Sequence, residues 1–429
     1  MFSVNRRGFL QRAAGLLVAA GIGRAGGDGA LPLEARAEAA PGAEPARLPI
    51  RPRAAALMAK KEEAAKSPPA EPWNELPIRA LSLYSPFPQD VAAFCAFVRD
   101  ALPKEGVNTL VVMFDYRCRF VSQPDLPGKK LLSLADVRTI AAACREAGVT
   151  LIPEMNLLAH QSEQIEIGPL LAKYPQLDES PDLNPPNPWR SGGEFDFYSK
   201  CLCPRHPDLF PIIGPMMDEL IDACGASAFH VGLDEAWIVA HPQCPRCGGS
   251  DPAEVFAEYV TRLHTRLASK KCRMWMWSDR LIDANKTGLF AWQASRNNTH
   301  RAIDQIPKDI MICDWKYEDA PPTPSYFAVK GFDVLPSSCY NAGAALGQLE
   351  QVYLVRKNAS RAFFSPTISS RMPGVFATTW MNAQDFIDTY YAKPGFQPTD
   401  NTKNTVDTFK RLFAEIRKNS STPKAEKTA

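Results

Sequence analysis

Short apolar segments recur along the chain between residues 78 and 380. They are rich in β-branched, Leu, Met and aromatic residues, a composition typical of buried β-strands, and most are separated by stretches with helical spacing. The eight segments are 78–84, 107–115, 149–156, 227–235, 272–279, 309–315, 332–338 and 374–380. Eight strands that mostly alternate with helices predict an α/β fold with a parallel sheet.

The intervening stretches carry start and stop signals for helices. One begins at Asp90 and ends at Gly106, and another begins after an N-cap residue, Ser133, and ends at Gly148. Ser and Asp favour helix N-termini, and Gly favours the position after a C-terminus. A third stretch, 251–271, repeats apolar residues every four positions, which predicts an amphipathic helix with one buried face.

This alternation favours a (β/α)8 TIM barrel over residues 76–418, with an open doubly wound sheet as the alternative. No GxGxxG motif follows the first segment, so dinucleotide binding has no support. Residues 41–75, rich in Ala, Pro and charge, are predicted to be a linker, and residues 419–429 a disordered tail.

The first 40 residues are predicted to be a targeting segment. Arg6 and Arg7 precede Phe9, Leu10 and a weakly apolar, Gly-rich stretch, and this pattern resembles the twin-arginine export signal. We therefore expect export to the periplasm or outside the cell, followed by cleavage. The stretch is too short for a confident membrane span, so no stable membrane insertion is expected after cleavage; retention as an uncleaved anchor is the alternative.

Composition narrows the classes of partner. The chain has 429 residues, of which 45% are hydrophobic and 22% charged, and its net charge is +2. This is ordinary for a globular protein, and there is no basic field of the kind that nucleic acid or anionic lipid requires. A neutral partner such as a glycan is compatible with the balance. Composition does not indicate the oligomeric state.

Polar or aromatic residues follow nearly every predicted strand. In a (β/α)8 barrel the carboxyl ends of the strands meet at one face, where catalytic residues lie. The residues at these ends are Asp115, Glu154, Asn156, His160, Asp234, Glu235, Trp277, Asp279, Asp314, Trp315, Tyr340 and Trp380. We therefore predict a site at this face.

Asp234 and Glu235 are adjacent carboxylates at the end of the fourth segment. On an exposed loop such a pair would be ordinary surface charge. In a partly dry pocket both cannot ionise freely, so one serves as a general acid and the other as a fixed negative charge. Cleavage of a glycosidic bond uses this division, and indole rings at strand ends can stack on the apolar faces of a sugar or simply fill the core.

Two motifs resemble those of the family-20 glycoside hydrolases, the β-N-acetylhexosaminidases. Residues 230–235, HVGLDE, are similar to the family's His-hydrophobic-Gly-Gly-Asp-Glu, and residues 153–160, PEMNLLAH, to its Pro-Glu-Ile-Asp-Met-Pro-Gly-His. The resemblance spans roughly residues 76 to 390 in the right order. Single aromatic matches are weaker individually; they are Trp277, Trp315, Tyr340 and Trp380.

The resemblance implies a retaining enzyme in which the substrate's 2-acetamido oxygen attacks the anomeric carbon. It implies that Asp234 holds the acetamido N–H, that Glu235 acts as acid and then base, and that Tyr340 binds the acetamido carbonyl. It further implies sugar contacts for Arg79, His160, Trp277, Trp315, Trp380 and Asn382, and supporting positions for Glu154, Asn156 and His230. His230 could equally be a buried core histidine. No cofactor is implied.

Four departures from the family pattern leave the substrate open. Leu233 replaces the second Gly, Asn156 stands where Asp is usual, and Asn382 stands where Glu often binds a sugar hydroxyl. We also expect a single domain without the family's α/β domain ahead of the barrel. The alternatives are a glycosidase for a modified or galacto-configured amino sugar and a non-catalytic exported carbohydrate-binding barrel.

Eleven cysteines include one CxxC motif, formed by Cys244 and Cys247 three residues after His241. This spacing suggests a structural zinc ion held by the three residues, although a closed zinc site needs four ligands. Cys201 and Cys203 form a second close pair near His206. Disulfides and reduced structural thiols are the alternatives for these cysteines.

Overall fold

The computed structural model describes residues 74–163, 165–185, 199–359 and 366–421. The predicted signal, 1–40, and all but the last two residues of the predicted linker, 41–75, lie outside these ranges. The chain's last described helix runs to Ser421, three residues past the predicted end of the barrel domain at 418.

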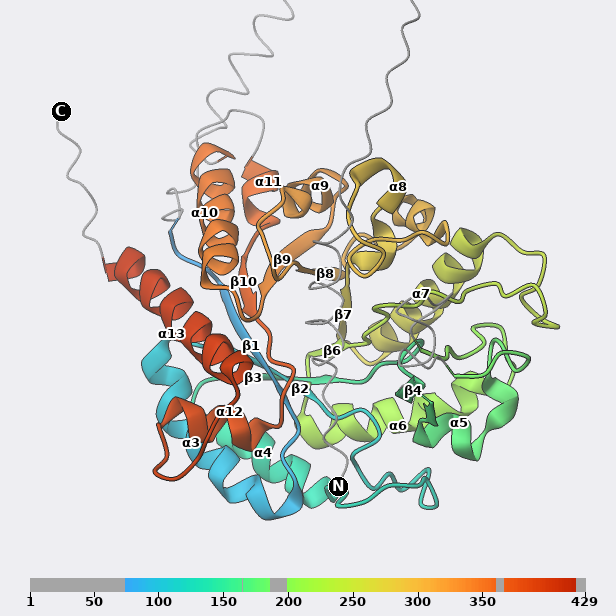
Figure 1. The fold of residues 1–429 in the computed structure, drawn as a ribbon, viewed down its shortest axis with the longest axis horizontal. Coiled ribbons are helices and arrows are strands. Elements are labelled where there is room, and N and C mark those ends of the chain that lie inside the picture. The colour runs from blue at the N-terminus through green and yellow to red at the C-terminus, as the bar shows by residue number, and fades with distance from the viewer. Residues whose placement is uncertain (1–73, 164, 186–198, 360–365, 422–429) are drawn as a thin grey trace, which may run out of the picture. The chain divides into compact units, whose positions relative to one another are not determined.

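Eight parallel strands form a closed barrel in the order β1-β10-β9-β8-β7-β6-β3-β2. Pairing of β1 with both β2 and β10 closes the ring (Figure 1). The strands are β1 (Ile78–Tyr84), β2 (Thr109–Met113), β3 (Thr150–Glu154), β6 (Ala228–His230), β7 (Arg273–Trp277), β8 (Met311–Trp315), β9 (Asp333–Ser338) and β10 (Gly374–Ala377). Each falls within one of the eight predicted segments, which confirms the (β/α)8 barrel.

The helices lie outside the ring of strands (Figure 1). The longer ones are α3 (Val91–Glu105), α4 (Leu134–Glu146), α6 (Leu209–Cys224), α7 (Pro252–Ser269), α10 (Ala342–Ala359) and α13 (Asp400–Ser421). The shorter ones are α5 (Pro169–Lys173), α8 (Ala284–Thr287), α9 (Thr323–Val329), α11 (Pro366–Ser370) and α12 (Ala383–Tyr390). Between β3 and α6 lies a small hairpin, β4 (Ser162–Glu163) with β5 (Glu166–Ile167). The last helix, α13, packs against the first, α3, so the two ends of the barrel domain meet.

The helix boundaries follow the local signals in the sequence. The Ser133 hydroxyl accepts from the Asp136 N–H at 3.1 Å, and the Asp136 carboxylate accepts from the Ser133 N–H at 2.8 Å, which completes a capping box on α4. Helix α3 ends at Gly106, which adopts φ +83°. The predicted apolar face of the 251–271 stretch is the buried face of α7.

The strands are buried on both faces, which explains their continuous apolar character. One cluster fills the barrel interior and includes Trp275, Trp277, Trp315 and Phe376, whereas a larger cluster lies between the strands and the helices. Trp277 stacks on Phe376 with ring centroids 5.6 Å apart and an interplanar angle of 3°. This packing anchors the aromatic residues that extend toward the carboxyl ends of the strands.

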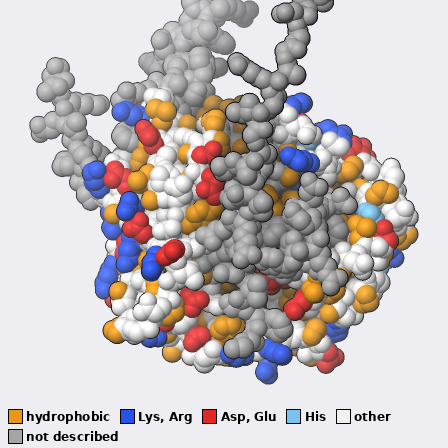
Figure 2. All heavy atoms as spheres, viewed as in Figure 1, with side chains coloured by type: hydrophobic (Ala, Val, Ile, Leu, Met, Phe, Trp, Pro, Cys, Tyr) orange, Lys and Arg blue, Asp and Glu red, His pale blue; other side chains and the backbone are white. Residues whose placement is uncertain are grey.

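Charged side chains of both signs are interspersed along the visible edges of the described surface in Figure 2. No helix among the described residues is long and apolar enough to span a membrane.

Candidate active site

The turn after β6 directs both acids of the predicted pair into one buried pocket. Gly232, Leu233 and Glu235 have φ values of +70°, +72° and +53°, so the backbone leaves strand geometry here. Asp234 and Glu235 are only 5% and 8% exposed. His160 Nε2 lies 3.1 Å from Asp234 Oδ2 and 3.5 Å from Glu235 Oε2. The two carboxylates therefore face the same imidazole and are not solvated surface charge.

Leu233 holds a left-handed conformation at the position where the family motif has its second Gly. For a residue with a Cβ this conformation costs about 1–2 kcal/mol. The side chain is fully buried in the core, and its burial offsets that cost. The turn geometry is thus retained although the Gly is not.

Gly232 has no room for a side chain. A Cβ at this position would lie 2.7 Å from Asn156 Cγ and 2.8 Å from Asn156 Cα. Gly225, at the C-terminus of α6, also has a positive φ, of +61°, but a Cβ placed there would have no neighbouring atom within 4 Å. Both glycines therefore have a positive φ, but only at Gly232 would an added Cβ clash with a neighbouring residue.

Substitution of Gly232 by Ala is expected to lower the free energy of unfolding by about 2–5 kcal/mol, from the left-handed φ plus overpacking against Asn156. Gly225→Ala, the matched control, is expected to lose only about 1–2 kcal/mol, because it carries the conformational cost alone. Urea unfolding followed by tryptophan fluorescence measures both. Equal losses in the two variants would contradict the predicted clash.

Asp234 is held by donors from the loop after β3. Asn156 Nδ2 donates to Asp234 Oδ1 at 2.5 Å, and His160 Nε2 contacts the other oxygen. The Asn156 backbone N–H in turn donates to Asp115 Oδ1, at 2.8 Å, so a residue at the end of β2 positions this loop. Three strand ends, those of β2, β3 and β6, therefore meet at Asp234.

Glu235 is positioned through Asp279, which begins the short 3-10 helix η3 (Asp279–Leu281) after β7. Asp279 Oδ2 accepts from the Glu235 N–H at 2.8 Å and from Arg280 Nε at 2.7 Å, while Oδ1 accepts from Trp315 Nε1 at 3.2 Å. Burial raises the pKa of Asp279, and Arg280 opposes this effect. In the sequence Asp279 stands out only as a polar strand end; its role as the link between Glu235 and Trp315 depends on the fold.

An aromatic wall lies at the carboxyl end of the barrel interior. It is formed by Trp277, Trp315, Tyr317 and Trp380. Trp380 Nε1 donates to the Tyr317 hydroxyl at 2.8 Å, and the Trp277 and Trp380 rings lie 5.8 Å apart. Trp315 and Tyr317 lie 5.2 Å apart. Sequence reasoning missed Tyr317, although a residue two positions after Trp315 on an extended chain shares its face. Its hydroxyl is buried, which raises its pKa well above the ordinary value.

A cationic residue and an aromatic residue in contact with each other adjoin this wall. The Arg117 guanidinium lies over the Tyr84 ring at 4.7 Å, and Tyr84 meets Trp380 edge-on at 6.4 Å. Neither residue was singled out from the sequence. Tyr84 is the last residue of β1, and Arg117 follows β2. Both residues therefore lie at the carboxyl end of the barrel, at its mouth.

Glu154 and His230 lie beneath the acids and are almost fully buried. Trp277 Nε1 donates to Glu154 Oε1 at 3.1 Å, and His230 Nδ1 lies 3.3 Å from the same oxygen. The Gly232 N–H donates to His230 Nδ1 at 3.1 Å. These contacts connect the turn after β6 to β3 and β7, which suits a supporting position for both residues.

Burial lowers the pKa of His230 to about 3, with Asp234 opposing the shift. An unfolded His titrates near pH ~6.5, so between pH ~3 and ~6.5 the unfolded chain binds one more proton here than the folded chain. The stability that depends on neutral His230 is therefore complete above pH ~6.5 and is lost as the pH falls.

Substitution of His230 by Gln is expected to make the free energy of unfolding less pH-dependent on the acid side. Below pH ~6.5 the wild-type value should fall faster than that of the variant, by up to about 1.4 kcal/mol per pH unit. Urea unfolding at pH 7.5, about 6 and about 5 measures the difference. The two slopes should coincide above pH ~7, which serves as the internal control; parallel curves down to pH ~5 would contradict a neutral His230.

The structure places two predicted sugar contacts, Arg79 and Asn382, at different ends of the barrel. Arg79 lies near the beginning of β1, at the opposite end of the barrel from the acids, and donates to the carbonyls of Gly106 and Leu76, each at 2.6 Å. The structure does not bring Arg79 to the predicted face, because strand polarity places residue 79 at the amino end. Asn382 is the N-cap residue of α12, partly buried after β10.

Tyr340 follows β9 and joins the edge of the aromatic wall. Its ring lies 5.9 Å from that of Tyr317, and its hydroxyl donates to Glu318 Oε1. The structure thus brings Tyr340 to the predicted face, with its hydroxyl engaged by a side chain from the loop after β8.

Among the described residues, two groups of three or more His, Cys, Asp or Glu residues have ligand atoms within 4.8 Å of one another. One is His160 with Asp234 and Glu235, the centre already described. The other is Glu179, Cys203, Cys244 and Cys247. The predicted zinc ligand His241 is not in this group: its Nε2 lies 2.9 Å from Asp182 Oδ1.

Residues 107–385 match the model of the glycosyl hydrolase family 20 catalytic domain. The chain belongs to this family. The two adjacent acids, the (β/α)8 barrel and the match together identify a family-20 glycoside hydrolase catalytic domain.

Relatives named β-hexosaminidase match parts of the chain. The one from Akkermansia muciniphila is 24% identical over 28% of this chain and 23% of its own length. The one from Emericella nidulans is 24% identical over 47% of this chain and 32% of its own length. The chain thus matches a third or less of the curated relatives.

Solved structures share the fold at low identity. The chitobiase of Flavobacterium johnsoniae has a TM-score of 0.51 and 16% identity, covering 80% of this chain and 52% of its own. The β-N-acetylhexosaminidase from Bacteroides fragilis has a TM-score of 0.50 and 14% identity, covering 81% and 74%. These likenesses support the barrel fold.

Proposed function

We propose that the chain is a retaining β-N-acetylhexosaminidase that removes terminal N-acetyl amino sugars by substrate-assisted catalysis. The observation that carries the proposal is the pair of buried neighbouring carboxylates, Asp234 and Glu235, facing His160 beside a wall of indole rings. Membership of family 20 and the β-hexosaminidase relatives support it.

Asp234 supplies the fixed negative charge. Its oxygens face donors from Asn156 and His160, and hydrogen bonds from donors stabilise the ionised form of a carboxylate. In the proposed reaction it accepts the acetamido N–H of the sugar and orients the carbonyl oxygen toward the anomeric carbon. As that oxygen attacks, positive charge develops on the forming oxazolinium ring, and the nearby carboxylate stabilises it.

Glu235 carries the proton. It protonates the departing glycosidic oxygen and then removes a proton from the water that opens the oxazolinium ring. The acetamido group serves as the nucleophile, so no enzyme carboxylate needs to attack, and two displacements retain the anomeric configuration. Asp279 keeps the Glu235 backbone in place for both steps.

The aromatic wall accommodates the sugar. Trp277, Trp315 and Trp380 would enclose the N-acetyl group and the apolar face of the ring. Tyr340 would donate to the acetamido carbonyl once its hydroxyl exchanges Glu318 for the substrate. A glycan is therefore the proposed partner. Export by the N-terminal segment stays a prediction, because that segment lies outside the described residues.

A second candidate is a glycosidase for a modified or galacto-configured amino sugar. The position of Arg79 at the opposite end of the barrel favours it, because Arg79 is then not in place to contact the sugar hydroxyls that the family's arginine on this strand binds. Arg117, over Tyr84, is a cationic side chain at the mouth that can contact a differently substituted sugar.

Hydrolysis of 4-nitrophenyl glycosides of N-acetylglucosamine, N-acetylgalactosamine and their sulfated forms by the purified chain tests both candidates. Product configuration is followed by NMR, and a thiazoline mimic of the cyclic intermediate is added as inhibitor. Retention with strong inhibition supports the proposal. Activity without inhibition would indicate a two-carboxylate mechanism, and no hydrolysis of any substrate would favour a carbohydrate-binding barrel.

A further inference from the structure

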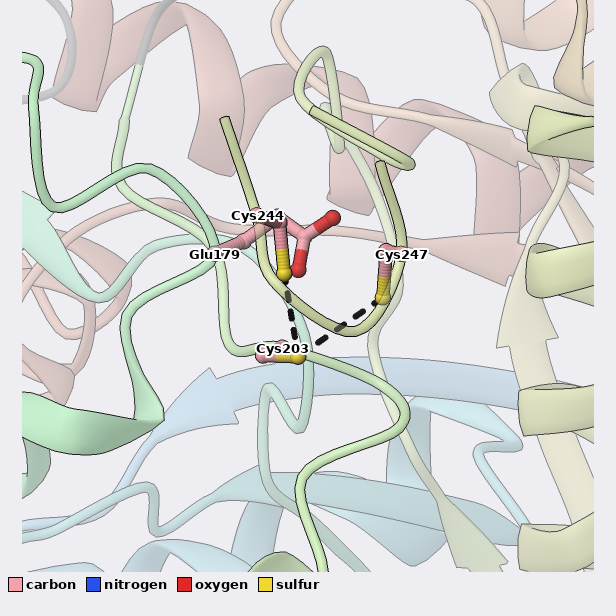
Figure 3. A group of neighbouring side chains, drawn as sticks. All are labelled: Glu179, Cys203, Cys244 and Cys247. Carbon is pink, nitrogen blue, oxygen red and sulfur yellow. Dashed lines mark hydrogen bonds between the residues drawn. The ribbon is translucent and has the colours of Figure 1, made fainter. Parts of the chain in front are cut away.

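Three thiols and one carboxyl group converge at a buried point beside the catalytic loops. Glu179, Cys203 and Cys247 are fully buried and Cys244 is 3% exposed. Figure 3 shows the Cys203 sulfur near those of Cys244 and Cys247, with the Glu179 carboxyl group on the same side as Cys244. The four ligand atoms lie within 4.8 Å of one another. Nothing in the proposed hydrolysis uses them.

The spacing of the sulfur atoms fits a shared metal ion. Cys203 Sγ lies 3.5 Å from Cys244 Sγ and 3.6 Å from Cys247 Sγ. A disulfide requires about 2.05 Å. Sulfur atoms at about 2.3 Å from a tetrahedral zinc ion are about 3.8 Å apart, close to the separations observed.

The loop after β6 presents Cys244 and Cys247 in a tight turn. The backbone N–H groups of Arg246 and Cys247 hydrogen-bond to the Cys244 sulfur. Gly248 completes the turn, because a Cβ there would lie 2.5 Å from the Pro242 carbonyl oxygen. Donors directed at sulfur suit a thiolate, the form that binds metal.

The segment between β3 and α6 presents the other two groups. An antiparallel bridge pairs Asp178 with Leu202. Next to it, the Glu179 N–H donates to the Cys201 carbonyl at 3.0 Å, and the Cys203 N–H to the Leu177 carbonyl at 2.7 Å. Glu179 and Cys203 are therefore fixed by backbone pairing before any metal binds.

Glu179 has one oxygen available to a ligand. Its Oε1 accepts from the His241 N–H at 3.0 Å, whereas Oε2 is buried and the carboxyl group's remaining neighbours are the thiols of Cys203 and Cys244. A thiol is a weak hydrogen-bond donor, so it compensates a buried carboxyl oxygen poorly. A cation at the centre of the three sulfur atoms would satisfy it.

We propose that Glu179, Cys203, Cys244 and Cys247 bind one structural Zn²⁺ ion. Three thiolates and one carboxylate form a closed four-ligand set that suits zinc, and leave no position open for catalysis. Binding releases the three thiol protons, and the carboxyl proton if it is present. The ion joins the loop after β3, which carries His160, to the loop after β6, which carries both acids. It therefore fixes the catalytic loops relative to each other.

The test is the metal and thiol content of the purified full chain. We expect about one zinc ion per chain by elemental mass spectrometry, and eleven titratable thiols after denaturation with chelator. Cys203→Ser and Cys247→Ser should bind less than about a tenth of the wild-type zinc, because each loses one of four ligands. Cys95→Ser, which alters a buried thiol on α3, is the matched control and should keep its zinc.

Two further measurements still test the proposal if a serine variant fails to fold. Glu179→Gln preserves size and should weaken zinc binding by about 10–100-fold in competition with a chelator. Replacement of the wild-type ion with Co²⁺ should give thiolate-to-cobalt charge transfer and intense tetrahedral d–d absorption. Nine thiols without zinc, meaning one disulfide among the eleven cysteines and no metal, would overturn the proposal. Eleven thiols without zinc, or another metal in its place, would do the same.

Discussion

Substitution of Glu235 by Gln is expected to lower kcat/KM by about 10³-fold for substrates with a sugar leaving group, the loss typical of a missing general acid–base. A glutamine has no proton to deliver to the departing oxygen and cannot activate water afterwards. A 2,4-dinitrophenyl leaving group departs with little protonation, so its departure should be much less affected. Rates for both substrates, measured with the same variant, give the comparison.

Added azide provides the control on mechanism for Glu235. Azide needs no general base, so it should restore turnover of the activated substrate and yield a β-configured glycosyl azide. Glu166→Gln, at an exposed position of β5, should leave all rates unchanged. A loss in the Glu235 variant that is the same for both leaving groups, with no azide effect, would remove the acid–base assignment.

Substitution of Asp234 by Asn is expected to lower kcat/KM by about 10²–10³-fold whatever the leaving group, as for loss of an electrostatic stabiliser. The amide preserves the shape and can still meet Asn156 and His160, but it brings no negative charge to the oxazolinium ring. Binding of the thiazoline inhibitor should weaken in parallel, because that molecule resembles the charged intermediate.

The dependence on leaving group separates the two acids. Asp234→Asn should reduce the rates for the sugar and dinitrophenyl leaving groups equally, in contrast to the Glu235 variant. Asp319→Asn, at an exposed position after β8, is the control and should leave the rates for both leaving groups unchanged. If thiazoline affinity is unchanged in the Asp234 variant, the carboxylate does not stabilise the cyclic intermediate.

Some site residues could be predicted because they lie at the ends of strands or in the turns just after them. The parallel barrel brings the carboxyl ends of all its strands to one face. Placing Asp234, Trp277 and Trp315 at this face therefore required only that the strands be assigned correctly. Asp279 and Tyr317 lie at the same face, and their roles depend on which neighbours they meet: the Glu235 N–H for one and Trp380 for the other. No local pattern encodes those contacts.

Two predicted site residues lie elsewhere in the structure, because each was considered as a single residue without tertiary context. Arg79 lies in the correct strand but at its amino end. His241 lies near the CxxC motif, yet its ring contacts Asp182 while Glu179 and Cys203 complete the cluster. These partners come from a segment that is distant in the chain, in which the bridge between Asp178 and Leu202 sets Glu179 beside Cys203 and Glu179 Oε1 accepts from the His241 N–H.

The sequence by itself determined the elements, because apolar runs, capping residues and glycines act over a few neighbouring positions. It favoured the barrel over an open doubly wound sheet, and the pairing of β1 with β10 in the tertiary structure decided between them. Tertiary structure alone decided which carboxylate is held by Asn156, which groups share the cysteine cluster and which end of the barrel each side chain occupies. Those outcomes depend on contacts between loops of distant segments, which short-range patterns do not specify.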